Sequence, residues 1–462
     1  MEDKFKVNID LLKKYDVPGP RYTSYPTAPY FHEGIGTCDY IKHIHREDEK
    51  IEKKDLSLYF HLPFCDTLCY FCGCNMMVTR NWDRIDEYID YLEKEIRFLK
   101  REISPDRKVI QLHWGGGTPT HLSPQQISRL GNIIHTYFDF REEAEVGVEI
   151  DPRELTRDHM KALHDAGFNR CSMGVQDFDP RVQQAVNRIQ PEKITRQAVE
   201  WARELDFQSL NLDLMYGLPY QHTTQYEKTL EKILALNPDR LAVFNYAHLP
   251  GLIKHQRLIK EEWIPPSEEK LQLLKLSIEK LTEAGYIYIG MDHFAKPEDE
   301  LSIAMKNGTL YRNFQGYSTH AGINLFAFGI TSIGMLSELY VQNFKKFKEY
   351  YEFLDRGELP VMRGIQLNQD DRLRREVVTQ LMCNFYLNKK PIEEKYGIIF
   401  DTYFEESLRA LESFEPDGLI QLGEDRITVL PTGRLLIRNI AMNFDAYLMQ
   451  KEGHKPQFSR TV

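Results

Sequence analysis

Six short apolar runs, each followed by an amphipathic stretch, succeed one another between residues 56 and 245. The runs cover residues 56–60, 109–112, 146–150, 170–175, 209–214 and 240–245. After the first run, apolar residues recur at helical spacing across 84–101. This repeat predicts a parallel sheet covered by helices, built either as a doubly wound sheet or as an incomplete barrel. In either architecture the functional site lies at the carboxyl ends of the strands.

The segments on either side of this repeat differ from it. Residues 1–55 are polar, and Pro18, Pro20, Pro26 and Pro29 exclude a long helix, so we expect an ordered arm. Residues 56–360 are predicted to hold the barrel domain and an extension that becomes more helical after residue 265. Residues 361–462 are predicted to form a mostly helical C-terminal domain with one hairpin over 419–430. A packing or lid role suits that domain better than DNA binding.

Charge and hydropathy restrict the partners. A formal net charge of −10 opposes binding to a nucleic-acid backbone unless basic residues gather locally. No apolar run approaches the roughly 18 residues that span a bilayer, and residues 1–7 lack the apolar stretch of a signal peptide. We therefore expect a cytoplasmic protein that binds neither nucleic acid nor membrane. Nothing in the sequence points to an obligate dimer, so we expect a monomer.

Four of the seven cysteines lie within ten residues, directly after the first predicted strand. Cys65, Cys69 and Cys72 form a CxxxCxxC run, whose three thiolates can hold three irons of a cubane cluster and leave the fourth iron open. The alternative is a tetrahedral zinc site with Cys74 as the fourth ligand, but no second cysteine pair follows. The spacing favours an iron–sulfur cluster over a zinc site. The other cysteines are predicted to be packing residues: Cys38, Cys171 and Cys383.

A glycine run, Gly115 to Gly117, follows the second predicted strand and continues into Thr118. It allows backbone amides to approach a ligand, although a tight turn explains it equally well when it is taken alone. Beside the cysteine loop it suits the amino-acid part of a nucleoside-bearing cofactor. Glu149 and Asp213, at or near strand ends, suit ribose hydroxyls, although such carboxylates are more often caps or ion-pair partners.

With these motifs, the sequence resembles the radical S-adenosylmethionine (SAM) superfamily and, within it, the oxygen-independent coproporphyrinogen III oxidases. The stretches that carry the resemblance are 21–27, 61–75, 112–120, 149–154, 173–178, 213–219, 245–250, 290–295 and 312–317. They span nearly the whole chain. The resemblance implies an incomplete (β/α)6 radical SAM barrel with an N-terminal arm and a mostly helical C-terminal domain.

The resemblance also implies the cofactors and the residues that hold them. Cys65, Cys69 and Cys72 would ligate a [4Fe–4S] cluster, and Cys74 would be a candidate catalytic residue rather than a ligand. Two SAM molecules would bind. The first would contact Tyr59, Gly116, Glu149 and Ile333, and the second would contact Gly117, Thr118, Gln176, Arg188, Asp213 and Ala247.

The implied reaction is the oxidative decarboxylation of two propionates of coproporphyrinogen III to vinyl groups, which gives protoporphyrinogen IX. A reduced flavodoxin- or ferredoxin-type protein would supply electrons. Because the substrate carries four carboxylates, the pocket of this acidic protein must concentrate positive charge. The candidates are Arg21, His293, Lys296 and Arg312. The arm aromatics Tyr22, Tyr25 and Tyr30 would either line the cavity or fasten the arm to the barrel.

Two other functions share parts of this pattern. A haem-degrading radical SAM methyltransferase would have the same cluster loop and barrel, and a non-enzymatic haem-trafficking chaperone would keep the cysteine run. The continuation Gly73-Cys74-Asn75 and the arm over 21–27 favour the oxidase.

Overall fold

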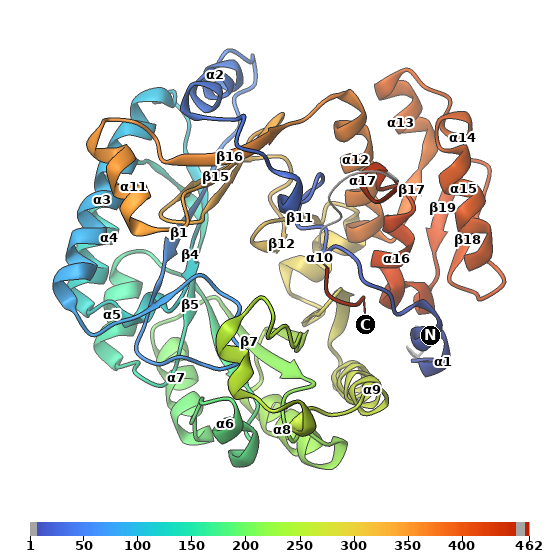
Figure 1. Ribbon diagram of the computed structural model, residues 1–462, viewed down its shortest axis with the longest axis horizontal. Helices are drawn as coiled ribbons and strands as arrows, with labels where there is room; N and C mark the ends of the chain where they lie inside the picture. The colour runs from blue at the N-terminus through green and yellow to red at the C-terminus, as the bar shows by residue number, and fades with distance from the viewer. Residues whose placement is uncertain (1–6, 450–457, 462) are drawn as a thin grey trace.

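The fold is organised around a twelve-stranded sheet, and the computed structural model describes residues 7–449 and 458–461. Six central strands are parallel neighbours in chain order: β1 (Leu56–Leu62), β4 (Val109–Gly116), β5 (Phe140–Ile150), β6 (Arg170–Gln176), β7 (Ser209–Tyr216) and β8 (Arg240–Asn245). A doubly wound sheet reverses its strand order at a switch point. The order of these six strands does not reverse, so the predicted incomplete barrel is confirmed (Figure 1).

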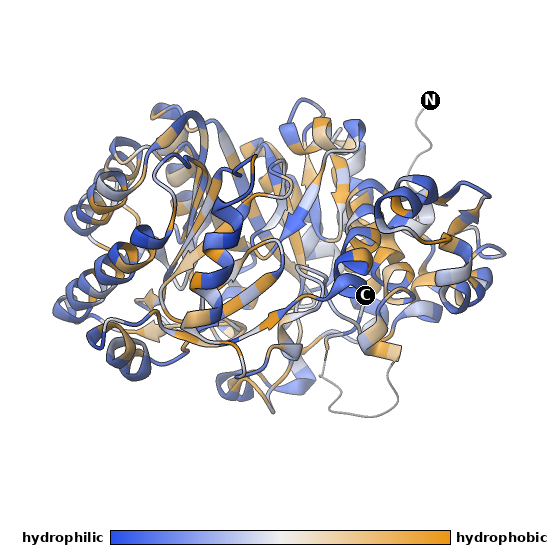
Figure 2. Ribbon diagram, turned by 90° about the horizontal axis from the view of Figure 1, so that it is seen from above, coloured by the Kyte–Doolittle hydropathy of each residue, from blue (hydrophilic) through white to orange (hydrophobic). Residues whose placement is uncertain are grey.

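Helices α3 (Trp82–Glu102), α4 (Pro124–Tyr137), α5 (Arg157–Asp165), α7 (Glu192–Glu204) and α8 (Thr223–Leu236) cover the outer face of these strands. The short helix α6 (Pro180–Ala185) follows β6, and Val182 at its start packs in one apolar cluster with Tyr70 and Phe71 of the cysteine loop. In α3, Ile85, Ile89 and Leu92 lie on one face and are fully buried against the sheet. Helix α3 begins where the Asn81 side chain accepts a hydrogen bond from the Arg84 backbone N–H at 3.3 Å. Figure 2 shows hydrophilic and hydrophobic stretches alternating along these outer helices, as an amphipathic pattern requires.

Additional strands extend both edges of the barrel sheet. Beside β1 lies parallel strand β13 (Asn324–Phe328), followed by antiparallel β14 (Ile333–Met335), β15 (Leu339–Asn343) and β16 (Val361–Gln366). Beside β8 lie antiparallel β10 (His293–Ala295) and β9 (Ile287–Gly290). The expectation of a more helical chain after residue 265 is therefore only partly right. Every residue of β13 and β15 is buried, so these strands lack the alternation that distinguishes a strand from a helix.

The helices expected after residue 265 are nevertheless present. They are α9 (Ser267–Glu283), α10 (Glu300–Asn307) and α11 (Phe347–Asp355). Between α10 and β13 the chain forms a small hairpin of β11 (Tyr311–Asn313) and β12 (Gly316–Ser318). In sequence, this hairpin therefore falls between two strands of the large sheet, β10 and β13.

The residues after β16 form the mostly helical C-terminal part that the sequence predicts (Figure 1). Its helices are α12 (Gln369–Asn384), α13 (Lys389–Tyr396), α14 (Phe400–Tyr403), α15 (Glu405–Leu411), α16 (Ile437–Met442) and α17 (Ala446–Met449). A three-stranded sheet accompanies them, with β17 (Tyr386–Asn388), β18 (Ile420–Leu422) and β19 (Arg426–Val429). Strands β18 and β19 are the expected hairpin within 419–430. The domain limits at 55/56 and 360/361 stay predictions.

The N-terminal arm contains α1 (Ile9–Tyr15) and α2 (Thr37–Asp48) and joins the barrel to the C-terminal part. Tyr22 is buried and donates its hydroxyl to Asp445 Oδ2 at 2.8 Å. The backbone oxygen of Tyr25 accepts a hydrogen bond from the Tyr340 hydroxyl at 3.1 Å, and its own hydroxyl accepts the Ala446 N–H at 3.1 Å. These contacts favour the fastening role for both tyrosines. Tyr30 packs against the ring of Tyr447, with 4.7 Å between centroids.

Two of the three predicted packing cysteines are buried, namely Cys171 and Cys383. The prediction for Cys38 is wrong, because Cys38 is exposed. It lies in the first turn of α2, whose buried face is formed by Tyr40, His43, Ile44 and Glu47. The phase of the helix therefore overrides the general tendency of cysteine to be buried.

Candidate active site

A cavity of about 210 Å³ lies at the carboxyl ends of the central strands. Most of the predicted site residues line it: Cys65, Cys69, Cys72, Cys74, Gly116, Gly117, Thr118, Glu149, Gln176, Arg188 and Asp213. They come from β4 to β7, at or near the carboxyl ends, or from the loops after β1, β4 and β6. Because parallel strands end at one edge of the sheet, residues far apart in sequence converge there.

The glycine run supports the cysteine loop directly. Gly117 donates its N–H to the Leu62 oxygen at 2.9 Å, and Thr118 donates to the Phe64 oxygen at 2.8 Å. A Cβ on Gly117 would lie 2.8 Å from the Phe64 oxygen and 2.9 Å from the Phe64 nitrogen. The Thr118 hydroxyl lies 3.3 Å from Cys65 Sγ. The backbone at Gly117 thus needs the absence of a side chain to hold the cysteine loop in place.

Two arginines surround the second cysteine of the run. Arg153 Nη2 lies 3.3 Å from Cys69 Sγ, and Arg188 Nη1 lies 3.7 Å from it. Both guanidiniums also bind Asp151, at 2.6 and 2.9 Å. Although burial acts in the opposite direction, the charges of Arg188 and Arg153 lower the pKa of Asp151 to about 2. Two guanidinium groups beside one sulfur suit a cysteine that ligates metal.

The sequence reasoning missed Asp151 and Arg153 as site residues. They lie in the stretch Glu149-Ile-Asp-Pro-Arg-Glu154 that follows the end of β5, so their position was the available signal. Their contact with Cys69 depends on the loop after the strand folding back over the cysteine loop.

The residues present fit a cubane cluster. Three cysteines of one loop line the cavity, and a cubane distributes its thiolates over different irons. Within residues 7–449 and 458–461, no three His, Cys, Asp or Glu side chains are grouped so that they could hold one metal ion. The cavity also contains buried polar atoms without partners among the described residues, at Gln176 Oε1 and Arg188 Nε. These atoms suit a polar cofactor beside the cysteines.

Glu149 is held at the end of β5 by its neighbours. Its Oε2 accepts the Gly116 N–H at 3.1 Å, and its Oε1 lies 3.7 Å from His113 Nε2. Burial raises the pKa of Glu149, but the hydrogen bond and charge of His113 outweigh it and lower the pKa. Glu149 is therefore an ionised acceptor next to the glycine run, which suits a hydroxyl or amine donor.

The pKa of Asp213 is shifted in the direction opposite to that of Glu149. Ser172 donates its hydroxyl to Asp213 Oδ2 at 2.9 Å, and Asn211 donates to Oδ1 at 2.7 Å. Burial, reinforced by the charge of Glu149, raises the pKa of Asp213 to about 6. Asp213 is thus mostly ionised at neutral pH but close to its protonation point. Nearby, Gln176 has a φ of 69°, a left-handed conformation that directs its amide at the strand end.

Replacing Asp213 by asparagine should stabilise the ligand-free protein at pH 7.5. The folded pKa lies above the usual value, so ionisation of Asp213 costs folding free energy above pH 6, and the cost disappears as the pH falls towards 4. We expect Asp213→Asn to raise the unfolding free energy by about 2 kcal/mol at pH 7.5, with a smaller gain at pH 5. The free energy of unfolding is measured by urea denaturation at both pH values.

Asp151→Asn is the matched control, because the pKa of Asp151 is lowered and its ionised form stabilises the fold. That variant should be less stable than the unaltered protein at pH 7.5. Equal effects of the two substitutions would contradict the assigned electrostatics.

Three predicted site residues do not line the cavity among the residues described: Tyr59, Ala247 and Ile333. Tyr59 lies on β1, its ring parallel to that of His113 with 6.1 Å between centroids. Tyr59 and Ile333 pack against the same apolar cluster beside the barrel. The Ala247 oxygen accepts a hydrogen bond from Gln256 Nε2, which also donates to the Phe71 oxygen in the cysteine loop. The structure therefore does not bring these three residues into the wall of the cavity.

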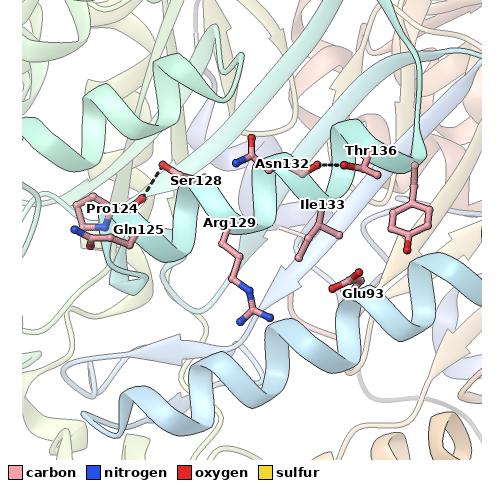
Figure 3. Close-up of a pocket in the computed structure, with 9 residues that line it drawn as sticks. Glu93, Pro124, Gln125, Ser128, Arg129, Asn132, Ile133 and Thr136 are labelled. Atoms are coloured by element: carbon pink, nitrogen blue, oxygen red, sulfur yellow. Dashed lines mark hydrogen bonds between the residues drawn. The ribbon is translucent and has the colours of Figure 1, made fainter.

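A second hollow, of about 710 Å³, lies on the outer face between α3 and α4 (Figure 3). Its hydroxyls at Ser128 and Thr136 donate to backbone oxygens of their own helix, at 3.0 and 2.7 Å. Arg129 pairs with Asp86 and Asp90. These three side chains are thus already paired within the two helices. None of the described helices is long and apolar enough to cross a membrane.

Comparisons with known proteins agree with this geometry. The Radical SAM superfamily model matches residues 59–233, and the HemN C-terminal domain model matches residues 367–436. The chain is 47% identical to the oxygen-independent coproporphyrinogen III oxidase of Salmonella typhimurium, over 100% of both chains. It is 47% identical to that of Escherichia coli, over 98% of both.

A solved structure is similar to this chain over nearly its whole length. It is described as coproporphyrinogen III oxidase (HemN) from Escherichia coli, a radical SAM enzyme, and it superposes with a TM-score of 0.91. Its sequence is 45% identical, and the match covers 96% of this chain and 100% of that one.

Proposed function

The chain belongs to the family of oxygen-independent coproporphyrinogen III oxidases, and from this premise we propose that it converts two propionates of coproporphyrinogen III to vinyl groups. The product is protoporphyrinogen IX. The observation that carries the proposal is full-length similarity to these oxidases, together with one cavity that contains the cysteine run, the glycine run and the strand-end carboxylates. The relatives carry the name of the oxidase, which favours it over the methyltransferase and the chaperone.

The family implies a [4Fe–4S] cluster and SAM. When bound, they would supply the radical chemistry that removes a hydrogen atom from a propionate, and an external electron acceptor would take up the electron released as CO2 is lost and the vinyl group forms. The chain's own residues would bind and orient these groups. Cys65, Cys69 and Cys72 would hold the cluster, and Arg153 and Arg188 lie against Cys69.

We assign two SAM molecules to the site. The first contacts Tyr59, Gly116, Glu149 and Ile333, and the second contacts Gly117, Thr118, Gln176, Arg188, Asp213 and Ala247. Glu149 and Asp213 each accept ribose hydroxyls. The assignment is supported by two separate acidic acceptors on β5 and β7, held by different partners. Cys74 donates its backbone N–H to Cys72 Sγ at 3.4 Å and is the candidate for proton handling beside the cluster.

A reduced flavodoxin- or ferredoxin-type protein is the proposed electron donor. We place the reaction in the cytoplasm, because the cysteines are free thiols that need a reducing compartment. The enzyme acts as a monomer and needs neither nucleic acid nor membrane.

Anaerobic reconstitution with iron and sulfide, followed by reductant, SAM and coproporphyrinogen III, tests the function. Protoporphyrinogen IX together with 5′-deoxyadenosine is the expected result. Tight haem binding without turnover would support the chaperone instead, and one zinc per chain without iron would contradict the cluster.

The number of SAM molecules is tested separately by equilibrium dialysis of the reconstituted protein. We expect two SAM molecules per chain, and one tightly bound molecule in Asp213→Ala, which removes a single ribose contact worth about 1–3 kcal/mol. The iron content should not change. A single SAM in the unaltered protein would contradict the two-molecule assignment.

A further inference from the structure

Asp213 shares the inner face of the sheet with a residue two strands away. Asp213 on β7 is paired with Ala242 on β8, and Ala242 is paired with His293 on β10. Residues directly opposite each other on neighbouring strands point to the same face. Neighbouring strands are about 4.8 Å apart, so His293 lies about 10 Å from Asp213 on that face. The strand-end cavity and the surroundings of His293 therefore face one interior space.

Aromatic rings connect His293 to two arginines. The His293 ring lies 5.9 Å from that of Phe244 and 5.4 Å from that of Tyr317. The Arg312 guanidinium lies over Tyr317 at 4.7 Å, and the Arg21 guanidinium lies over Phe244 at 6.0 Å. The arm residue Arg21 and the β11 residue Arg312 are thus brought to the same part of the interior.

In the cluster formed by Arg21, Arg312, Arg438, Asp292 and His293, positive charge exceeds negative charge. Arg312 is only 6% exposed, and its Nε and Nη1 have no hydrogen-bond partner among the described residues. Arg21 pairs with Asp292. Arg438 donates to backbone oxygens, including that of Pro20 at 3.0 Å. Burial and the charges of Arg312 and Arg438 lower the pKa of Arg21 to about 10.

His293, the remaining residue of the cluster, carries no charge that could compensate the arginines. Burial and the neighbouring arginines lower the pKa of His293 to about 3, so its imidazole is neutral at pH 7. Its Nδ1 also has no partner in the part of the chain that the structure describes. Buried charges in proteins are normally paired, because desolvation of an unpaired ion is costly. The cluster therefore has the composition of a site that awaits an anion.

We propose that Arg312, assisted by Arg21, binds a propionate carboxylate of the tetrapyrrole and so anchors the macrocycle beside the strand-end cavity. This proposal rests on the proposed function and adds the residues that recognise the substrate. A guanidinium with free N–H groups in a water-poor interior forms strong charge-assisted hydrogen bonds with a carboxylate. The distance of about 10 Å between His293 and Asp213 puts the arginines and the cofactor side within reach of a single macrocycle.

Lys296, the fourth candidate from the sequence, does not belong to this cluster. It follows β10 at the amino end of β8, where its Nζ lies 3.1 Å from Asp239 Oδ1 and 3.3 Å from the Asn237 oxygen. Strand β10 runs antiparallel to β8, so Lys296, three residues after His293, lies away from the carboxyl ends of the parallel strands. Its charge is already paired.

Binding of coproporphyrin III, the oxidised and non-reacting form of the substrate, to the anaerobic cluster-loaded enzyme tests the proposal by fluorescence titration. Arg312→Gln should raise the Kd by about 10- to 100-fold, as expected for loss of a buried charge-assisted bond. Arg312→Lys should recover part of the affinity. Lys296→Gln is the control and should bind as the unaltered protein does.

Thermal unfolding adds a readout that a merely structural arginine would not give. Without ligand, Arg312→Met should be at least as stable as the unaltered protein, because it removes an uncompensated buried charge. It should also lose the increase in Tm that coproporphyrin III produces. If Arg312 variants do not fold, Arg21→Gln decides, with an expected Kd increase of at least 5-fold for loss of one charged contact.

Unchanged affinity for coproporphyrin III in both Arg312→Gln and Arg21→Gln would overturn the proposal. Failure of the proposed function looks different, because the unaltered enzyme would then form no protoporphyrinogen IX whatever the arginines bind. Cleavage of SAM by dithionite in Arg312→Gln, at the rate of the unaltered protein, shows that the cofactor side is intact.

Discussion

Cys69→Ser is expected to abolish both cluster assembly and product formation while the barrel remains folded. Cys69 is 7% exposed and lies against the guanidinium groups of Arg153 and Arg188. Three thiolates are the minimum for a cubane with one open iron, and a serine hydroxyl does not replace a thiolate at neutral pH. Iron and sulfide content, measured beside protoporphyrinogen formation, should both fall to background.

The control for this prediction is Cys38→Ser, because Cys38 is exposed on α2, outside the strand-end cavity. It should keep full iron content and activity. Far-ultraviolet circular dichroism of Cys69→Ser should match that of the unaltered protein, since the barrel sheet is formed by other residues. An active Cys69→Ser enzyme with a full complement of iron would refute the assigned ligand set.

Gly117→Ala should reduce product formation by at least about 100-fold, because a displacement of about 1 Å at a reacting site has effects of that size. The new Cβ would lie 2.8 Å from the Phe64 oxygen and 2.9 Å from the Phe64 nitrogen, both backbone atoms that cannot rotate away. The cysteine loop that begins at Phe64 must therefore shift. Turnover rates and the electron-spin signal of the reduced cluster, with and without SAM, measure this.

Gly36→Ala is the matched control, since a Cβ at Gly36 meets nothing within 4 Å. This variant should retain normal turnover. A Gly117→Ala enzyme with normal turnover and a normal response of the cluster signal to SAM would show that the glycine run does not position the cysteine loop.

Local patterns in the sequence determined much of this result. The six central strands were predictable because apolar runs and helical periodicity depend only on nearby residues, as α3 illustrates with its buried Ile85, Ile89 and Leu92. The cysteine run was recognisable because its three ligands lie within eight residues. Strands β13 and β15 were not predictable, because full burial removes the alternation that identifies a strand.

The amino-acid sequence by itself determined the barrel class, the cluster loop and the resemblance to the oxidase family. Only the tertiary structure decided which charges meet. It joined Arg153 to Cys69 and paired Lys296 with Asp239. It also placed Arg312 without a carboxylate partner among the described residues, on the same part of the interior as Arg21. The physical reason is that a charge interacts with whatever lies within a few ångströms in space, and strand pairing, rather than separation along the chain, sets those neighbours.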